Sequence, residues 1–387
     1  MKFKNIFSTV VSAFILLSPI CNAEACTSAI ISADLNPYGR PILWKHRDTS
    51  TTDNKVEYIP SDGVSQAYVA LYNAADMGLN EAWMGMNESG FAVMNTASYN
   101  LKDDKVSNKK MDKEGFVMTK ALRSCKTVDD FANLLDTLPR PMGVEANFGV
   151  IDAFGNGAYF ETNNHSFIRF DLKDAPDGML VRTNYSHAGR PKEGYGYVRE
   201  ANAECLLAPY AEKKAITSEL LTEVISRTFY HDGFKKDFTM SGETALLDED
   251  YIPRYKSTAT IAIEGCVPLQ AEEKVNPDIL KDQYIMWTGI GYPPVAEIRA
   301  VRCTPDGVDP DLKGNRVNGH SHLGDVAKAK RAQVFSSKGK KKYINLPLLY
   351  NESGTGYAQK AIEKNHKIYK EEIERRDNSA NVSPDEL

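Results

Sequence analysis

Residues 23–32 read AEACTSAIIS, and the position of Cys26 in this stretch decides how the rest of the chain is interpreted. Two lysines stand within the first four residues, and an apolar run follows over residues 7–20. A cationic start, a short apolar segment and small residues at −3 and −1 of a cut are the layout of a secretory signal. We therefore predict that residues 1–25 are removed as a signal peptide and that the mature protein is secreted or periplasmic.

Cleavage after Ala25 makes Cys26 the first residue of the mature chain. A terminal cysteine carries a nucleophilic sulfur and a free α-amine, whose ordinary pKa of about 7.7–8.0 lets it act as a base near neutral pH. Three alternatives stay open. The cut could fall elsewhere, Cys26 could carry the lipid of a bacterial lipoprotein, or it could be half of a disulfide.

The composition is that of an ordinary globular protein, with 47 basic and 52 acidic residues and a formal net charge of -5. This balance gives no global attraction to nucleic acid or to an anionic membrane. After the signal no apolar stretch approaches the roughly 20 residues that span a bilayer, so we predict no transmembrane segment. The lysine-rich tract at 338–342 is interpreted as a solvated loop rather than a nucleic-acid patch.

The remaining cysteines after Cys26 are widely spaced and match no small disulfide framework: Cys125, Cys205, Cys266 and Cys303. They could form two disulfides in any of three pairings, or remain buried thiols. No Cys-x-x-Cys occurs, which argues against structural zinc, and His320-Ser321-His322 alone does not indicate a metal site. We expect neither a metal nor an organic cofactor.

Strand and turn signals dominate the first part of the chain. The pattern predicts a hairpin of Cys26–Ser32 and Ile42–Asp48 around the turn Asn36–Pro41. Further strands are expected at 67–72, on both sides of the turn Asn87-Glu88-Ser89-Gly90, at 148–152, 158–161, 179–185, 258–266, 284–289 and 295–303.

Helical signals fall between these strands. Helices are expected at 111–124, after Thr127, which with Asp130 approximates a capping box, at 197–207, from Ser218 onward and at 357–376. Strands alternating with helical pairs indicate an α+β protein in which helices cover both faces of two stacked sheets. We assign residues 26–303 to one catalytic domain and 304–387 to a partly helical C-terminal extension that packs on or continues it.

Three polar residues stand at predicted strand ends, where they could serve a reaction at Cys26. Asp48 ends the strand paired with that of the cysteine, and can orient the terminal amine. Asn95 and Asn184 close two other strands, and asparagine side chains can donate hydrogen bonds to a tetrahedral oxyanion. Taken singly, each is an ordinary strand-end or turn residue.

Together these motifs resemble a family. A Cys-Thr start, a short hairpin ending in Asp48, the run from Met86 to Asn95 (MNESGFAVMN) and Thr183-Asn184-Tyr185 are similar to the N-terminal-nucleophile (Ntn) hydrolases of the linear-amide branch. That branch includes choloylglycine hydrolases, penicillin V acylases, acid-ceramidase-like amidases and isopenicillin-N acyltransferases. The resemblance covers Cys26 to about Cys205, with an echo at 284–303.

The resemblance implies a four-layer αββα sandwich of two stacked antiparallel sheets. It further implies that Cys26 is nucleophile and base, that Asp48 positions the amine, and that Asn95 and Asn184 form the oxyanion hole. The arginine that the family carries three residues before the aspartate is Lys45 here. The adjacent Arg47 is expected to face the opposite side of the strand.

A second family arginine corresponds to Arg199, with Arg190 as its rival. Glu161 sits where relatives carry an acidic strand end. No histidine among His46, His165, His187 and His231 has a recognisable catalytic context, which argues against a cysteine–histidine pair.

The resemblance implies an enzyme that cleaves a linear amide C–N bond, in an N-acyl compound or a short peptide, through an acyl-thioester on Cys26. An acyltransferase, a dipeptidase of the same superfamily and a lipid-anchored binding protein remain alternatives. The expected partner is a small-molecule substrate, and a homo-oligomer is possible. Five aromatic residues are candidates to line an acyl pocket: Trp44, Trp83, Tyr99, Tyr185 and Trp287.

Overall fold

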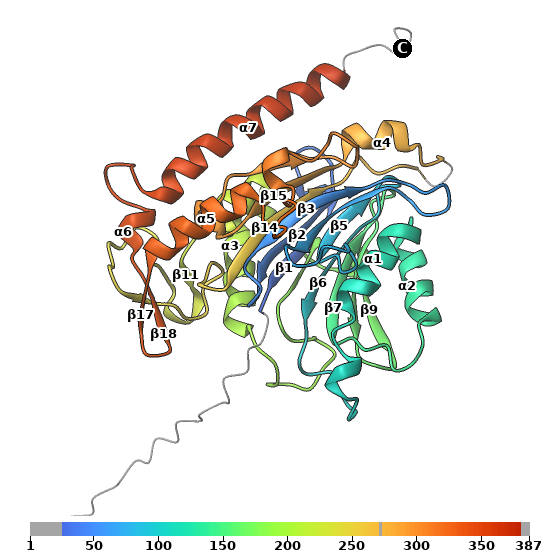
Figure 1. Ribbon diagram of the computed structural model, residues 1–387, viewed down its shortest axis with the longest axis horizontal. Helices are drawn as coiled ribbons and strands as arrows, with labels where there is room; N and C mark the ends of the chain where they lie inside the picture. Colours follow the sequence, from blue (N-terminus) through green and yellow to red (C-terminus); the bar gives the residue numbers. More distant parts are fainter. Residues whose placement is uncertain (1–24, 271–272, 381–387) are drawn as a thin grey trace, which may run out of the picture.

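A computed structural model describes residues 25–270 and 273–380, and the predicted signal segment before Ala25 lies outside the described residues. Two antiparallel sheets are stacked face to face (Figure 1). The first has six strands in the order β10 (Met179–Arg182), β1 (Thr27–Ile31), β2 (Ile42–Asp48), β14 (Ser257–Glu264), β15 (Ile285–Ile290) and β16 (Arg299–Val301). The predicted hairpin is therefore confirmed as β1 and β2.

The second sheet has seven strands that follow the chain in order: β3 (Asn54–Ile59), β4 (Tyr68–Asn73), β5 (Met84–Asn87), β6 (Ala92–Ala97), β7 (Ala146–Ile151), β8 (Gly157–Thr162) and β9 (Phe167–Asp171). The turn at Asn87–Gly90 was expected from its residues, and Gly90 has a φ of 78°, a left-handed conformation that glycine adopts at little cost. β3 and β9 were not predicted.

Helices cover both outer faces, which completes the predicted four layers. α1 (Glu114–Ser124) and α2 (Val128–Thr137) pack on the seven-stranded sheet, and the capping box of Thr127 and Asp130 is present at the start of α2. On the six-stranded sheet lie α3 (Tyr197–Ala211), a π-helix (Leu220–Ile225) and α7 (Tyr357–Ala380). α1 and α2 lie on one side of Figure 1, and α7 on the other.

Alternation along each strand supplies the three apolar layers. Leu43 on β2 joins Val69 and Met94 between the sheets, whereas its neighbour Trp44 points to the helical layer with Leu207 and Tyr369. Phe131 of α2 lies in the layer outside the other sheet. Two of the proposed pocket aromatics are thus core residues, because Trp44 and Trp287 are fully buried under helices.

The chain after residue 304 is more ordered than its sequence indicated. It contains α5 (His322–Val334), a hairpin of β17 (Phe335–Lys338) and β18 (Lys341–Ile344), and α6 (Leu346–Leu349). Tyr369 of α7 stacks on Trp287 with ring centroids 4.1 Å apart. This segment therefore contributes to the core beside the six-stranded sheet.

The remaining elements are short. They are α4 (Pro277–Gln283), β11 (Tyr230–His231), β12 (Lys236–Asp237), β13 (Leu246–Leu247), and 3₁₀ turns at Ala33–Leu35, Asn108–Lys110, Leu172–Asp174, Asp232–Phe234, Pro293–Val295 and Pro310–Leu312. β16 is shorter at both ends than the strand expected at 295–303, because the N–H of Ala296 closes the 3₁₀ turn onto the Pro293 carbonyl and the N–H of Arg302 donates to the Gly307 carbonyl.

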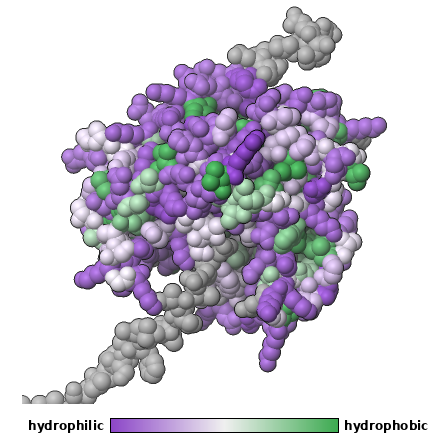
Figure 2. Space-filling model, in the orientation of Figure 1, coloured by the Kyte–Doolittle hydropathy of each residue, from purple (hydrophilic) through white to green (hydrophobic). Residues whose placement is uncertain are grey.

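The outer surface is largely polar. Figure 2 shows hydrophilic side chains over most of the viewed face, with apolar ones in small scattered groups. Among the described residues, no helix combines the length and the apolar character that crossing a membrane requires.

The layer between α2 and its sheet yields a stability prediction. Phe131 is fully buried and lies edge-on to Phe148 and Phe160, at centroid distances of 5.6 and 5.2 Å. We expect Phe131→Ala to lower the free energy of unfolding by about 3–5 kcal/mol, measured by urea denaturation. Phe116 on α1 is 44% exposed, so the same change there should cost less than about 1 kcal/mol. Equal losses at both positions would contradict the layer assignment.

Candidate active site

Cys26 immediately precedes β1 and is only 5% exposed. Its backbone N–H donates to Asn184 Oδ1 at 2.8 Å, and its Sγ lies 3.9 Å from the carbonyl oxygen of Asp48. The pairing of β1 with β2 extends one step further, because the N–H of Ala25 donates to the same Asp48 carbonyl at 3.2 Å. The sheet thus brings Cys26, Asp48 and Asn184 together.

The carboxylate of Asp48 is fully buried and is held by two residues of a later segment. Ser257 Oγ donates to its Oδ1 at 2.6 Å, and Arg254 donates to its Oδ2 through Nη2 and, at 3.2 Å, through Nε. Burial disfavours the charge of Arg254, but attraction to Asp48 outweighs it and raises the pKa of Arg254. Buried charges need such partners.

Arg254 and Ser257 were missed by the sequence analysis. Arg254 lies in the loop before β14 and Ser257 is the first residue of that strand, 206 and 209 residues from Asp48, and neither belongs to a motif. Arg254 also donates to the carbonyl oxygen of Ala25 at 3.3 Å. The only available signal was the position of Arg254 just before a predicted strand, which does not by itself indicate a site.

Arg199 is buried at the start of α3 and contacts Cys26 directly. It donates through Nη1 to the carbonyl of Cys26 at 2.5 Å and to Thr27 Oγ1 at 3.1 Å, and through Nη2 to Asn184 Oδ1 at 2.8 Å. Burial, followed by repulsion from Arg254, lowers the pKa of Arg199 to about 10, so it stays charged at neutral pH. Its rival Arg190 instead forms an exposed ion pair with Glu193.

The amide of Asn184 is oriented by three hydrogen bonds. Its Oδ1 accepts from Cys26 and Arg199, and its Nδ2 donates to the carbonyl of Ala97 at 2.8 Å. Nδ2 carries a second N–H, so the expected oxyanion role stays a prediction, whereas Oδ1 holds the Cys26 nitrogen. The contact between Asn184 Oδ1 and the Cys26 N–H favours a role for Asn184 in orienting the Cys26 nitrogen.

Lys45 links the two sheets at Asn95. Its Nζ donates to Asn95 Oδ1 at 2.8 Å and to the Trp83 carbonyl at 3.0 Å. Because Asn95 Oδ1 accepts from Lys45, the Nδ2 end of the amide is left to donate elsewhere. A single lysine ammonium is enough to fix this orientation. The expectation that Arg47 faces the opposite side of the strand is wrong, because residues two apart on a strand share a face and both Lys45 and Arg47 contact Trp83. Arg47 donates to Asn54 Oδ1 at 2.6 Å and to Asn73 Oδ1 at 2.9 Å.

Glu161 has a structural place near the site. It pairs with Arg182 at 2.6 Å and accepts from the backbone N–H groups of His187 and Ala188 at 3.0 and 2.8 Å. These bonds shape the loop that follows Asn184.

His46 lies on β2 between the candidate residues Lys45 and Asp48. It is fully buried, shares a hydrogen bond of 2.8 Å with Ser257 Oγ and lies 3.7 Å from Asp48 Oδ1. Burial lowers its pKa from 6.5 to about 4, so the ring is neutral at pH 7. Ser257 Oγ thus bridges the His46 ring and the Asp48 carboxylate.

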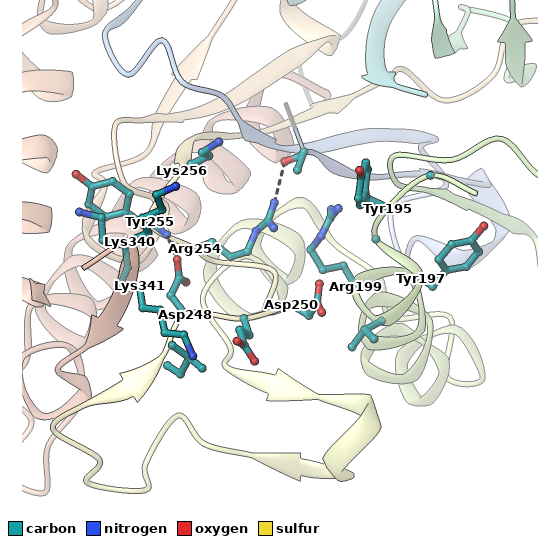
Figure 3. Close-up of a pocket in the computed structure, with 17 residues that line it drawn as sticks. Tyr195, Tyr197, Arg199, Asp248, Asp250, Arg254, Tyr255, Lys256, Lys340 and Lys341 are labelled. Carbon is teal, nitrogen blue, oxygen red and sulfur yellow. Dashed lines mark hydrogen bonds between the residues drawn. The ribbon is translucent and has the colours of Figure 1, made fainter. Parts of the chain in front are cut away.

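A pocket of about 750 Å³ opens beside Ala25, the residue that precedes Cys26. Its walls include Ala25, Arg199, Arg254 and the aromatic rings of Tyr195 and Tyr197 (Figure 3). Two expected pocket residues lie behind these rings rather than on the wall. Tyr99 packs edge-on to Tyr195, and Tyr185 stacks on Tyr197 at 4.0 Å.

Elsewhere in the described chain, Asp53, His320 and Asp325 bring three potential metal ligands within 4.8 Å of one another. Lys328 Nζ lies 2.6 Å from Asp53 and supplies positive charge at that place. We assign no metal site there. The five described cysteines are free thiols, and Cys21 lies outside the described residues.

Comparison with known proteins supports the family resemblance. Residues 48–207 match the family model of acyl-coenzyme A:6-aminopenicillanic acid acyl-transferase. Over this segment the chain is similar to that family, which confirms the resemblance that the motifs indicated. The matched segment includes Asp48, Asn95, Asn184 and Arg199, and begins after Cys26. No curated protein matches this chain.

Three solved structures are similar in parts of their fold. An N-acylethanolamine-hydrolyzing acid amidase ortholog from Caenorhabditis elegans has 13% identity and a TM-score of 0.40, over 67% of this chain and 98% of that one. A conjugated bile acid hydrolase mutant from Clostridium perfringens has 11% identity and a TM-score of 0.44, over 72% of this chain and 92% of that one. Penicillin V acylase from Agrobacterium tumefaciens has 12% identity and a TM-score of 0.43, over 78% of this chain and 96% of that one.

The buried histidine yields a pH prediction. The folded pKa of about 4 lies below the ordinary 6.5, so between these values the unfolded chain binds more protons and stability falls as the pH drops. From pH 7 to 5 we expect His46 to remove about 2 kcal/mol of unfolding free energy. His46→Asn should remove this part of the pH slope in urea titrations, whereas the exposed His165→Asn should leave it. Identical slopes for wild type and His46→Asn would contradict the assignment.

Proposed function

We propose that the mature chain, beginning at Cys26 after export and removal of residues 1–25, is a cysteine Ntn hydrolase that cleaves a linear amide C–N bond. One observation carries the proposal. The nitrogen and the sulfur of Cys26 lie among Asn184, Asp48, the buried Arg199 and the partly exposed Arg254, where a terminal amine would be held beside its own thiol. A nucleophile activated by its own α-amine needs such orientation.

The proposed reaction uses groups already described. The α-amine of Cys26 takes the thiol proton while Sγ attacks the amide carbon. The resulting oxyanion is stabilised by donors at the site, for which Asn95 is our candidate, and the α-ammonium returns the proton to the leaving amine as the C–N bond breaks. Water then attacks the thioester, the acid is released and the thiol is restored.

The charged residues have supporting roles in this scheme. Asn184 Oδ1 and the carboxyl end of β2 orient the amine, and Arg254 and Ser257 hold Asp48 in place. Arg199 fixes the backbone of Cys26 and the amide of Asn184 together. Lys45 positions Asn95.

Acyl transfer is the second candidate, because the matching family model describes an acyl-transferase. The thioester would be the same, with an amine in place of water as acceptor. Incubating the mature protein with penicillin V, bile conjugates, N-acyl amino acids and dipeptides, with and without glycine as acceptor, separates the two by their products. Mass spectrometry of the mature terminus distinguishes a free Cys26 from a lipidated one.

The role of the terminal amine can be tested by one inserted residue. A mature form with one glycine before Cys26 keeps the thiol and all side chains but turns the α-nitrogen into an amide, which accepts no proton. We expect kcat on a substrate from that panel to fall by about 10²–10⁴. Mass spectrometry must confirm that the glycine remains. Full activity of the uncleaved form would reject the mechanism.

The charge of Asp48 is tested by Asp48→Asn, which keeps the shape of the side chain. We expect kcat to fall by at least about 10²-fold, because the amine loses the nearby carboxylate that positions it. The matched control is Asp34→Asn, since Asp34 is an exposed aspartate that ends no sheet strand. An unchanged kcat and pH–rate profile in a folded Asp48→Asn protein would show that Asp48 serves the fold alone.

A further inference from the structure

The pocket beside Ala25 has one wall made of lysines. Lys256 precedes β14, and Lys340, Lys341 and Lys342 come from the β17–β18 hairpin. Figure 3 shows Lys340, Lys341 and Lys256 on the same side of the pocket as Tyr255, across from Tyr195 and Tyr197. The tract that the sequence analysis interpreted as a solvated loop therefore faces the candidate active site.

Backbone pairing fixes this hairpin to the pocket. β18 pairs with β13, with Leu246 opposite Ile344 and Leu247 opposite Tyr343. The N–H of Asp248 then donates to the carbonyl of Lys342 at 3.0 Å. Gly339 forms the turn with a φ of 62°, which a glycine adopts readily. The lysines are thus carried on an anchored strand.

The acidic residues of the same pocket act mainly on its arginines. Arg254 is paired with Asp48, and Asp248 and Asp250 add further attraction to it. Asp250 also attracts Arg199. Glu249 also lines the pocket, so with Asp48 four carboxylates face two arginines and four lysines, and positive charge remains in excess.

The lysines of the pocket differ from its arginines in their interactions. Lys342 lies over the Tyr255 ring at 4.3 Å and donates to Ser337 Oγ at 2.7 Å. In the part of the chain that the structure describes, Lys256, Lys340 and Lys341 form no ion pair with a carboxylate within 4.0 Å. Three ammonium groups on one wall of a concave pocket, without a paired anion, raise the local concentration of anions.

We propose that this lysine wall, Lys256 with Lys340 and Lys341, binds an anionic group of the substrate while Cys26 attacks its amide. The inference rests on the proposed function and narrows its substrate class. The anionic group is a carboxylate, sulfonate or phosphate, which the compact ammonium of lysine can bind without a fixed approach geometry.

Alkylation of Cys26 tests the lysine wall without a known substrate. Iodoacetate and iodoacetamide form the same bond to a thiolate and differ in charge, so the ratio of their rate constants reports the field that Cys26 experiences. The mature protein is compared with Lys340→Glu/Lys341→Glu, and alkylated Cys26 is quantified by mass spectrometry. The control is Lys213→Glu/Lys214→Glu, the same double charge reversal at adjacent exposed lysines after α3.

We expect the iodoacetate-to-iodoacetamide ratio to fall about 10-fold in the hairpin variant and to change less than about 2-fold in the control. Added salt should lower the wild-type ratio toward that of the variant. The iodoacetamide rate itself should hardly change, which shows that the thiol remains intact.

The outcomes separate the two proposals. An unchanged ratio in the hairpin variant, with rapid iodoacetamide labelling, would overturn the lysine wall and leave the nucleophile assignment standing. Failure of iodoacetamide to label Cys26 in the folded mature protein would count against the proposed function itself. An equal fall in the control would also overturn the lysine wall, because net charge alone would then explain the effect.

Discussion

The buried carboxylate of Asp48 is the constraint on which the site depends. It ends β2 beside Ala25 and is held by Arg254 and Ser257, which lie 206 and 209 residues later in the sequence. Removing one partner of a buried ion pair leaves an uncompensated charge, at a cost of about 3–5 kcal/mol. The sheet order is therefore tied to the chemistry, because β14 must lie next to β2 for this pair to form.

The local elements could be predicted because their signals are local. The hairpin of residues 26–48, the capping box at Thr127 and the turn at Asn87–Gly90 each follow from neighbouring residues, and their order indicated the four layers. Arg254 could not be predicted in the same way. Its partner lies 206 residues away, and no spacing or composition connects the two before the sheet has formed.

The lysine tract shows a second limit of sequence patterns. Composition at 338–342 indicates solvent exposure, and Lys340 and Lys341 are indeed exposed. What composition lacks is the pairing of β18 with β13, which carries the tract to the pocket. Trp44 and Trp287 show the reverse case. They were expected to line a pocket because they are large aromatic residues, but they pack in the core between the six-stranded sheet and its helices.

The peptide bond before Cys26 is held at both of its ends. Ala25 donates to the Asp48 carbonyl and accepts from Arg254, while the Cys26 nitrogen donates to Asn184. A cut after Ala25 removes one acceptor from Arg254 and leaves Asp48 as its acceptor at the site. The same cut converts the nitrogen on Asn184 from an amide, which cannot take a proton, into an amine, which can. Strand pairing and Asn184 therefore already set the position of the nitrogen, and the proposed cut would change its chemistry without requiring β1 or β2 to move.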